Sequence, residues 1–243
     1  MKIAVAGATG RVGRHIVDLL EAGGHDVVAM SRATGVDVFA GDGLAEALTG
    51  AECVVDVTTT PTPDEQAATE FFTTAARNLH EAGGRAGVQR LIVVSIIGTD
   101  RIPGGYNAAK VAQERAVLEG PIPARIVRAA QFHEFVEQVV EWGRQGDVSH
   151  VPQMRTQLVA ARTVAELIAD LAVDRDSAPG PVLEIAGPRE ESMVEAARLL
   201  VARRGDPVRI EGATWADGYE SGALLPGPGA TLAGPTFEEW LAA

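Results

Sequence analysis

Tyr106 and Lys110 are four residues apart in the stretch YNAAK, a spacing that places both side chains on one face of a helix. A phenol is a poor acid or base near neutral pH because its pKa is about 10. A neighbouring ammonium favours the phenolate and lowers that pKa. Tyr106 is therefore a candidate proton donor to a carbonyl oxygen that receives a hydride, or a proton acceptor in the reverse direction.

Ser95 ends the apolar run RLIVVS, where we expect the carboxyl end of a strand. A hydroxyl at that point is placed to hydrogen-bond the same carbonyl oxygen as Tyr106. The alternative is a strand-end residue that bonds only to its local backbone. The candidate catalytic residues are Tyr106, Lys110 and Ser95.

A glycine-rich stretch, AVAGATGRVG, lies near the amino terminus between an apolar run and an expected helix. In a dinucleotide-binding loop, Gly7 makes the tight turn, Gly10 lets a diphosphate approach the backbone, and Gly13 lets the helix pack close to the sheet. The helix that starts near Arg11 directs its free N–H groups and positive end at the diphosphate. The alternative is a glycine turn without a ligand. The candidate cofactor-binding residues here are Gly7, Thr9, Gly10, Arg11, Val12 and Gly13.

The end of the second expected strand, DVVAM, bears on which dinucleotide is bound. NAD sites usually place an acid there to bind the ribose 2′-hydroxyl, but the nearby carboxylate, Asp26, starts the strand. Ser31 and Arg32 follow it and, with Arg11, suit a 2′-phosphate. We therefore expect NADP(H) rather than NAD(H), the alternative being that Arg32 is a solvated loop charge.

Short runs rich in Val and Ile alternate with helical patterns along most of the chain. Such runs are typical of strands that are buried on both faces of a parallel sheet. The repeated strand–helix–strand order predicts a doubly wound α/β fold, the Rossmann fold. The expected strands cover residues 3–7, 26–30, 36–39, 53–59, 90–98 and 124–130, with helices near 11–23, 63–83 and 107–118.

The regular alternation weakens after residue 131. We expect residues 1–131 to form the dinucleotide-binding core, and residues 132–243 a small substrate-covering region that packs on it as one compact unit. Phe132 and His133 are candidates for the substrate pocket, although packing at a helix start also explains a single histidine. Further expected elements are helices at 132–144, 163–173, 190–205 and 237–242, an added sheet strand at 182–186, and an ordered loop at 226–236.

Composition narrows the class of partner. The formal net charge of −12 over 243 residues argues against nucleic acid and anionic membranes, so we expect a small-molecule substrate. The single cysteine, Cys53, excludes an intramolecular disulfide and favours a reduced compartment. MKIAVAG resembles no signal peptide and no apolar run reaches about 18 residues, so we expect a cytoplasmic protein without membrane spans. The five histidines show no metal-ligand spacing. The oligomeric state stays open, with a homodimer as one option.

GATGRVG, the strand-end Ser95, YNAAK and RIVRAAQFHEF together resemble an atypical short-chain dehydrogenase/reductase of the NmrA-like NAD(P)-binding oxidoreductase group. The resemblance implies that the first loop holds the diphosphate, that Tyr106 is the acid/base group, and that Lys110 also binds the nicotinamide ribose. It further implies cofactor contacts at Asp42, Gly43, Thr58 and Thr59. Ser95 and Tyr106 are eleven residues apart, a shorter gap than the wider family's common pattern.

Three functions follow from these observations. The first is an NADP(H)-dependent oxidoreductase that transfers a hydride to or from a small carbonyl or quinone-like substrate. The second is an NADP(H)-sensing regulator without turnover, as in some NmrA-like relatives, although a sensor has no need of the Tyr106–Lys110 pair. The third is an epimerase or dehydratase that retains its cofactor.

Overall fold

A parallel β-sheet is the central feature of the fold. The computed structural model describes residues 1–60, 62, 64–174, 180–215 and 218–243. Its strands are β1 (Lys2–Ala6), β2 (Asp26–Met30), β3 (Cys53–Asp56), β4 (Arg90–Ile96), β5 (Ala124–Ala129), β6 (Arg144–Gln145), β7 (Val148–Pro152), β8 (Arg155–Thr156), β9 (Val182–Ala186), β10 (Glu191–Ser192), β11 (Arg209–Ala213) and β12 (Thr231–Leu232). Its helices are α1 (Gly13–Ala22), the 3-10 turn η1 (Arg32–Thr34), α2 (Leu44–Ala47), α3 (Glu65–Ala86), α4 (Gly105–Leu118), α5 (His133–Trp142), α6 (Ala161–Val173), α7 (Met193–Arg204) and α8 (Phe237–Ala242).

Seven strands form one sheet in the order β12-β9-β5-β4-β3-β1-β2. β1 pairs in parallel with β2 and β3, so that Ala6 is opposite Met30 on one side and Asp56 on the other. All four residues of β3 are buried, which explains the unbroken apolar character of this run. The doubly wound α/β fold predicted from the sequence is confirmed, and the strand expected at 182–186 is β9.

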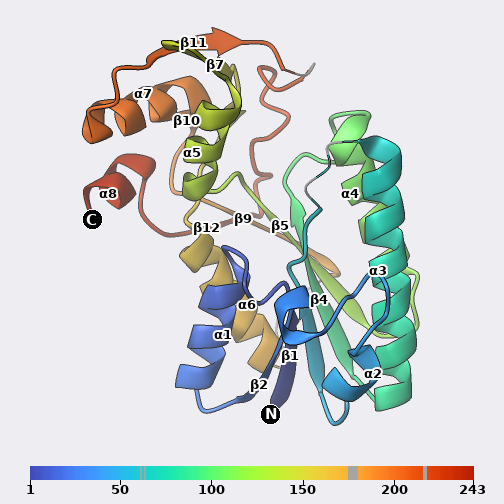
Figure 1. The fold of residues 1–243 in the computed structure, drawn as a ribbon. Helices are drawn as coiled ribbons and strands as arrows, with labels where there is room; N and C mark the ends of the chain where they lie inside the picture. The colour runs from blue at the N-terminus through green and yellow to red at the C-terminus, as the bar shows by residue number, and fades with distance from the viewer. Residues whose placement is uncertain (61, 63, 175–179, 216–217) are drawn as a thin grey trace. The chain divides into compact units, whose positions relative to one another are not determined.

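Helices cover both faces of the sheet. Figure 1 shows α3 and α4 side by side on one face, and α1 and α6 on the other. α3 begins where the Asp64 carboxylate accepts a hydrogen bond from the Ala67 N–H (2.8 Å), and it ends at Gly87 with φ of 78°. Alanines on the inner face of α3, such as Ala75 and Ala76, are buried, which lets this long helix pack closely against the sheet and α4.

The strand expected at residues 36–39 is absent, although these residues are described. The Asp37 carboxylate accepts hydrogen bonds from the N–H groups of Phe39 (2.8 Å) and Ala40 (3.1 Å), and the Asp37 carbonyl accepts one from Gly41. These local bonds fold the segment into a turn. The sheet consequently ends at β2.

Two compact units share the chain, and each takes three segments of it. The first unit contains Met1–Ser95, Pro103–Arg128 and Val164–Leu183, and the second contains Ile96–Ile102, Ala129–Thr163 and Glu184–Ala243. The sequence predicted one boundary after residue 131. Residues 164–183 group with the first unit because this segment bonds to its strands: the Ala172 carbonyl accepts from Arg90, and the Pro181 carbonyl accepts from the Ile126 N–H.

The second unit has its own apolar core and its own small sheet, β11-β7-β6. β11 pairs in parallel with β7, and the core packs residues of α5, α7 and α8, among them Val136, Leu200 and Phe237. The tail contains a two-residue strand, β12, which pairs with β9, where the sequence predicted a loop throughout. β12 is an edge strand, the place where a glycine- and proline-rich segment can still pair.

The first unit also holds a buried ion pair. Arg128 donates two hydrogen bonds to the Glu114 carboxylate (2.9 and 2.7 Å), and the two side chains are only 15% and 8% exposed. Glu81 and Arg85 form a pair on α3 whose side chains are 59% and 78% exposed. The two pairs allow a direct comparison of buried and exposed charge.

We expect Glu114→Gln to lower the free energy of unfolding by about 3–5 kcal/mol, because it removes the carboxylate charge that the buried Arg128 guanidinium faces. The matched control Glu81→Gln removes an exposed pair and changes stability by about 1 kcal/mol or less. Urea denaturation of both variants measures the difference. Equal losses in the two variants would show that burial does not set the cost of breaking the Glu114–Arg128 pair.

Candidate functional site

The glycine-rich loop is tightly packed where β1 turns into α1. Gly7 has φ of +79°, and a Cβ at this position would lie 2.9 Å from the Val57 carbonyl oxygen. A Cβ on Gly13 would lie 2.1 Å from the Gly7 carbonyl oxygen, and the Gly10 N–H donates to that same oxygen (2.9 Å). Only glycine fits at Gly7 and Gly13, so close backbone packing shapes this loop and the first turn of α1. We call this stretch the glycine cradle, and it is the candidate site for an anion.

The other residues of this loop divide by exposure. Thr9 and Arg11 are exposed, whereas the Val12 side chain is buried and Val12 precedes the first residue of α1. Val12 therefore anchors the start of the helix and has only its backbone to offer a ligand. Thr9 and Arg11 have side chains that face solvent around the cradle.

The loop after β2 lies next to the glycine cradle. The Met30 carbonyl accepts hydrogen bonds from the N–H groups of Gly7 (3.0 Å) and Ala8 (3.3 Å). The Ser31 hydroxyl accepts from the Thr34 N–H (3.2 Å), and the Thr34 hydroxyl bonds back to the Ser31 N–H (2.9 Å), so Ser31 caps η1. Arg32 is exposed. It is therefore the better placed of the two for a solvent-facing phosphate.

Asp42 and Gly43 lie against this same loop. A Cβ on Gly43 would be 2.6 Å from the carbonyl oxygen of Gly35, which ends η1, and Gly43 has φ of +71°. Asp42 is exposed, and its carbonyl accepts from the Asp37 N–H (3.0 Å). The structure thus brings together two stretches, residues 31–32 and 42–43, that were both predicted to contact the cofactor.

Tyr106 lies in the first turn of α4. Its hydroxyl is 2.9 Å from the Thr59 hydroxyl, and its ring packs edge-on against Phe72 of α3, with ring centroids 5.7 Å apart. The sequence predicted that Lys110 lowers the pKa of Tyr106. Instead, burial raises the pKa of Tyr106, and the hydrogen bond with Thr59 offsets only part of that effect.

Lys110 is buried one turn further along α4. Its Nζ donates to the Val94 carbonyl (2.8 Å) and to the Gln113 side chain, and it lies 4.5 Å from the centre of the Phe72 ring. Burial lowers the pKa of Lys110 to about 8, although the charges of Asp56 and Glu114 act in the opposite direction. Tyr106 and Lys110 therefore contact the same aromatic ring, and most of the lysine is still charged at neutral pH.

Ser95 is at the end of β4, directly after the carbonyl that accepts from Lys110. The side chain is 1% exposed, and its hydroxyl has no hydrogen-bond partner among the described residues. Buried hydroxyls are normally paired, so an unpaired one at the carboxyl end of a parallel strand suits a ligand atom. The Ser95 hydroxyl therefore does not make the local backbone bond that was the alternative, and its role toward a substrate oxygen stays a prediction.

The segment after β3 joins these parts. The Val57 carbonyl lies against Gly7, and Thr59 contacts Tyr106. The Asp56 carboxylate accepts hydrogen bonds from both the N–H (2.9 Å) and the hydroxyl (2.6 Å) of Thr58. Asp56 is missing from the site predicted above. The one available signal was a carboxylate inside an otherwise apolar run, CVVDV.

Phe132 and His133 belong to the second unit. The His133 side chain is 1% exposed, and its ring packs against Phe237 (5.5 Å between ring centroids) and Trp240 (5.2 Å) at the start of α5. Burial lowers the pKa of His133 to about 4, so the imidazole is neutral at physiological pH. This environment matches packing at a helix start, and a pocket role for Phe132 and His133 stays a prediction.

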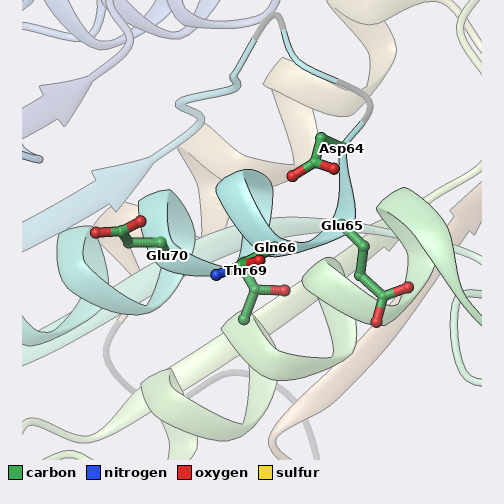
Figure 2. A pocket seen from close by; sticks show the side chains of 5 residues that line it. All are labelled: Asp64, Glu65, Gln66, Thr69 and Glu70. Carbon is green, nitrogen blue, oxygen red and sulfur yellow. The ribbon is translucent and has the colours of Figure 1, made fainter.

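An open hollow of about 790 Å³ lies at the start of α3. It is lined by Asp64, Glu65, Gln66, Thr69 and Glu70, and Figure 2 shows the Glu65 and Glu70 side chains pointing away from each other. Glu65 accepts a hydrogen bond from the Gly105 N–H (2.7 Å), which ties α3 to the start of α4. Three carboxylates around this hollow would repel a dinucleotide diphosphate, so the hollow is not a candidate for binding one.

The fold and the glycine cradle define a dinucleotide-binding α/β protein. A family described as NAD(P)H-binding matches residues 7–175, well over half of the sequence. The chain belongs to this NAD(P)H-binding family. A comparison with curated proteins gives no match.

Solved structures show the same fold. A nucleoside-diphosphate-sugar epimerase from Staphylococcus aureus superposes with a TM-score of 0.75 at 16% identity, over 100% of both chains. An NADPH-dependent quinone oxidoreductase from Escherichia coli, complexed with NADPH, gives 0.70 at 17% identity, over 99% of this chain and 98% of the other. A short-chain dehydrogenase/reductase superfamily protein from Agrobacterium tumefaciens, with bound NAD, gives 0.69 at 18% identity, over 100% and 95%.

Two further features bear on function: membrane-spanning helices and groups of metal-binding side chains. Within the part of the chain that the structure describes, no helix combines the length and apolar character that a membrane span requires. Nor do three or more His, Cys, Asp or Glu side chains in the same described ranges gather in positions that could hold a metal ion.

We expect Gly13→Ala to abolish nucleotide binding and to destabilise the protein, because the added methyl group would lie within 2.1 Å of the Gly7 carbonyl oxygen. Gly84→Ala in α3 is the matched control. A Cβ at Gly84 meets nothing within 4 Å, and alanine stabilises a helix by about 0.5–1 kcal/mol over glycine. Thermal shift with and without NADPH measures both effects. Unchanged nucleotide binding in Gly13→Ala would show that the cradle is not the site.

Proposed function

We propose that this protein is an NADP(H)-dependent oxidoreductase that reduces a small carbonyl or quinone-like compound. One arrangement carries this proposal. On α4, Tyr106 contacts Thr59 and Lys110 lies over the ring of Phe72. Thr59 belongs to the segment after β3, and the Val57 carbonyl of that segment lies against Gly7 of the glycine cradle. An acid/base group and an anion cradle in one unit are what hydride transfer to a carbonyl requires. The net charge of −12 supports a small-molecule substrate over nucleic acid.

The residues of this chain have separate tasks in the proposal. The cradle at Gly7, Gly10 and Gly13 binds the diphosphate through backbone N–H groups and the start of α1. Lys110 holds the nicotinamide ribose through its ammonium, and the buried hydroxyl of Ser95 orients the substrate oxygen. When bound, the reduced nicotinamide supplies the hydride. Tyr106 donates the proton that neutralises the oxygen.

The protonation state of Tyr106 is that of a proton donor. Burial raises its pKa, so Tyr106 holds its proton at neutral pH. The same rise makes the phenol a weaker acid, so proton transfer depends on stabilisation of the phenolate when the substrate is bound. The proposed reaction is written from NADPH to the substrate, and the same groups serve the reverse step.

Two alternatives make different predictions for one experiment. The protein is incubated with NADPH and a panel of ketones, aldehydes and quinones while the nicotinamide absorbance is followed. Oxidation of NADPH with a member of the panel supports the oxidoreductase. A sensor binds NADPH without consuming it, and an epimerase or dehydratase with a recycled cofactor converts its substrate without net change in absorbance. Binding without turnover on any panel member would favour these alternatives.

We expect Tyr106→Phe to lower kcat by about a hundredfold or more while leaving NADPH binding intact, because the variant keeps the ring but loses the proton donor. The other tyrosine of the sequence, Tyr219, lies in the second unit and provides the control. We expect Tyr219→Phe to leave turnover unchanged. Steady-state rates and thermal shifts with NADPH check both statements. Full activity in Tyr106→Phe would remove this residue from the mechanism.

We expect Arg32→Ala to weaken NADPH binding by about tenfold and to leave NADH binding unchanged, since an exposed guanidinium after β2 suits only the 2′-phosphate. Arg77→Ala, which removes an arginine from α3, is the control and affects neither nucleotide. Titrations of both nucleotides by thermal shift provide the measurement. Equal losses for NADPH and NADH would contradict a 2′-phosphate contact at Arg32.

A further inference from the structure

Asp56 is a buried carboxylate to which the proposed reaction gives no task. It ends β3 in the middle of the sheet and is 1% exposed. One oxygen, Oδ1, accepts both hydrogen bonds from Thr58, whereas Oδ2 is buried without a hydrogen-bond partner among the described residues. A charged group in such a place is costly unless it compensates another charge or fixes local structure.

We propose that Asp56 is a positioning residue for the Tyr106–Lys110 pair: its carboxylate keeps the Lys110 ammonium charged and shapes the turn that holds Thr59 against Tyr106. The catalytic meaning of this inference rests on the proposed function. The charge state of Lys110, however, can be measured without any substrate or cofactor.

The turn after β3 is fixed by Asp56. Thr58 donates both its N–H and its hydroxyl to the same carboxylate oxygen, which holds the backbone directly after the strand. Thr59 is the next residue, and its hydroxyl is 2.9 Å from that of Tyr106. Asp56 thereby acts on Tyr106 through two consecutive threonines, without touching it.

Asp56 lies beside the strand residue that anchors Lys110. It is opposite Val93 in the parallel pairing of β3 with β4, and the carbonyl of the next residue, Val94, accepts a hydrogen bond from the Lys110 ammonium. The elements around Lys110 present two carboxylates, Asp56 from β3 and Glu114 from α4, while Phe72 of α3 and the Val94 carbonyl of β4 are uncharged. Glu114 is already paired through two hydrogen bonds with Arg128 of β5. Asp56 is thus the carboxylate whose charge is left to balance the buried ammonium.

The sign of the expected effect follows from this balance. Burial raises the pKa of Asp56, and the bonds from Thr58 and the charge of Lys110 act against that rise. Burial lowers the pKa of Lys110 to about 8, and the Asp56 charge limits the fall. Removal of the Asp56 charge therefore lowers the pKa of Lys110 further, towards neutral pH.

The test uses Asp56→Asn, which keeps an oxygen acceptor for Thr58 but removes the charge. The sequence has two lysines, so NMR of protein labelled with ¹³C and ¹⁵N in lysine follows Lys110, with the half-buried Lys2, which donates to the Thr49 carbonyl, as internal reference. We expect the Lys110 titration midpoint to fall by about one pH unit. Asp26→Asn, an exposed carboxylate at the start of β2, is the matched control and leaves it unchanged.

A Lys110 midpoint that is the same in Asp56→Asn and in the wild-type protein would overturn the proposal. Lys110→Met gives the reciprocal measurement, in which the carboxyl ¹³C signal of Asp56 titrates at higher pH once the ammonium is gone. An unchanged Asp56 titration there would overturn it equally. This second variant keeps the test available if Asp56→Asn fails to fold.

The turn is tested by comparing Asp56→Ala with Asp56→Asn. Alanine removes the acceptor for Thr58, so the contact between Thr59 and Tyr106 is lost. The Tyr106 phenol of Asp56→Ala then titrates at higher pH than in the wild-type protein. Asparagine keeps the acceptor, so the phenol of Asp56→Asn titrates as in the wild-type protein. Ultraviolet absorbance of the phenolate reports this, with Tyr219 as a constant background. Identical phenol titrations in the alanine variant and the wild-type protein would contradict the positioning of Thr59.

Turnover adds a separate readout. In Asp56→Asn, the alkaline limb of the pH profile of kcat/KM moves to lower pH by the same amount as the Lys110 midpoint. If no variant or wild-type protein turns over any substrate, the proposed function fails, yet the lysine titration still decides the role of Asp56. Failure of the two proposals is therefore distinguishable.

Discussion

A charged ammonium inside the first unit is the constraint on which the site depends. Lys110 is 4% exposed, and the surrounding structure supplies a carbonyl, an amide, an aromatic face and two carboxylates to stabilise it. Two of these groups, the Val94 carbonyl and the Asp56 carboxylate, come from the carboxyl-terminal parts of neighbouring parallel strands, because parallel strands bring their carboxyl ends to one edge of the sheet. The buried face of α4 consequently carries Lys110, Gln113 and Glu114 beside Ala109 and Val117, where an ordinary surface helix would bury apolar residues alone.

The sequence predicts most of the fold because its signals are local and agree with one another. Buried strands such as β3 and β4 are continuous apolar runs, and glycines mark the turn after β1. The prediction fails at residues 36–39, where the alternation of Val36, Val38 and their neighbours suggests a strand. There the Asp37 carboxylate competes for the backbone N–H groups that a sheet would use, and local hydrogen bonds prevail over strand pairing.

The candidate site is predictable only where spacing along the chain carries the information. The glycine cradle and the Tyr106–Lys110 pair depend on fixed offsets in one helix or loop, so the sequence identifies them. Phe72 contacts Lys110 and the charge of Asp56 acts on it from elements distant in sequence, and no local pattern reveals such neighbours. The predicted shift of the Tyr106 pKa is wrong in sign for the same reason, since burial depends on α3, which the spacing of YNAAK does not include.

Burial acts on Tyr106 and Lys110 in opposite directions, and this sets the order in which they lose their protons. It raises the pKa of Tyr106 above its usual value and lowers that of Lys110 to about 8, so the lysine deprotonates first. Lys110 therefore does not make Tyr106 a phenolate at neutral pH. A protonated phenol and a charged ammonium coexist below about pH 8, the state that proton donation to a reduced substrate requires. Any change that lowers the pKa of Lys110 therefore lowers the upper pH limit of this range.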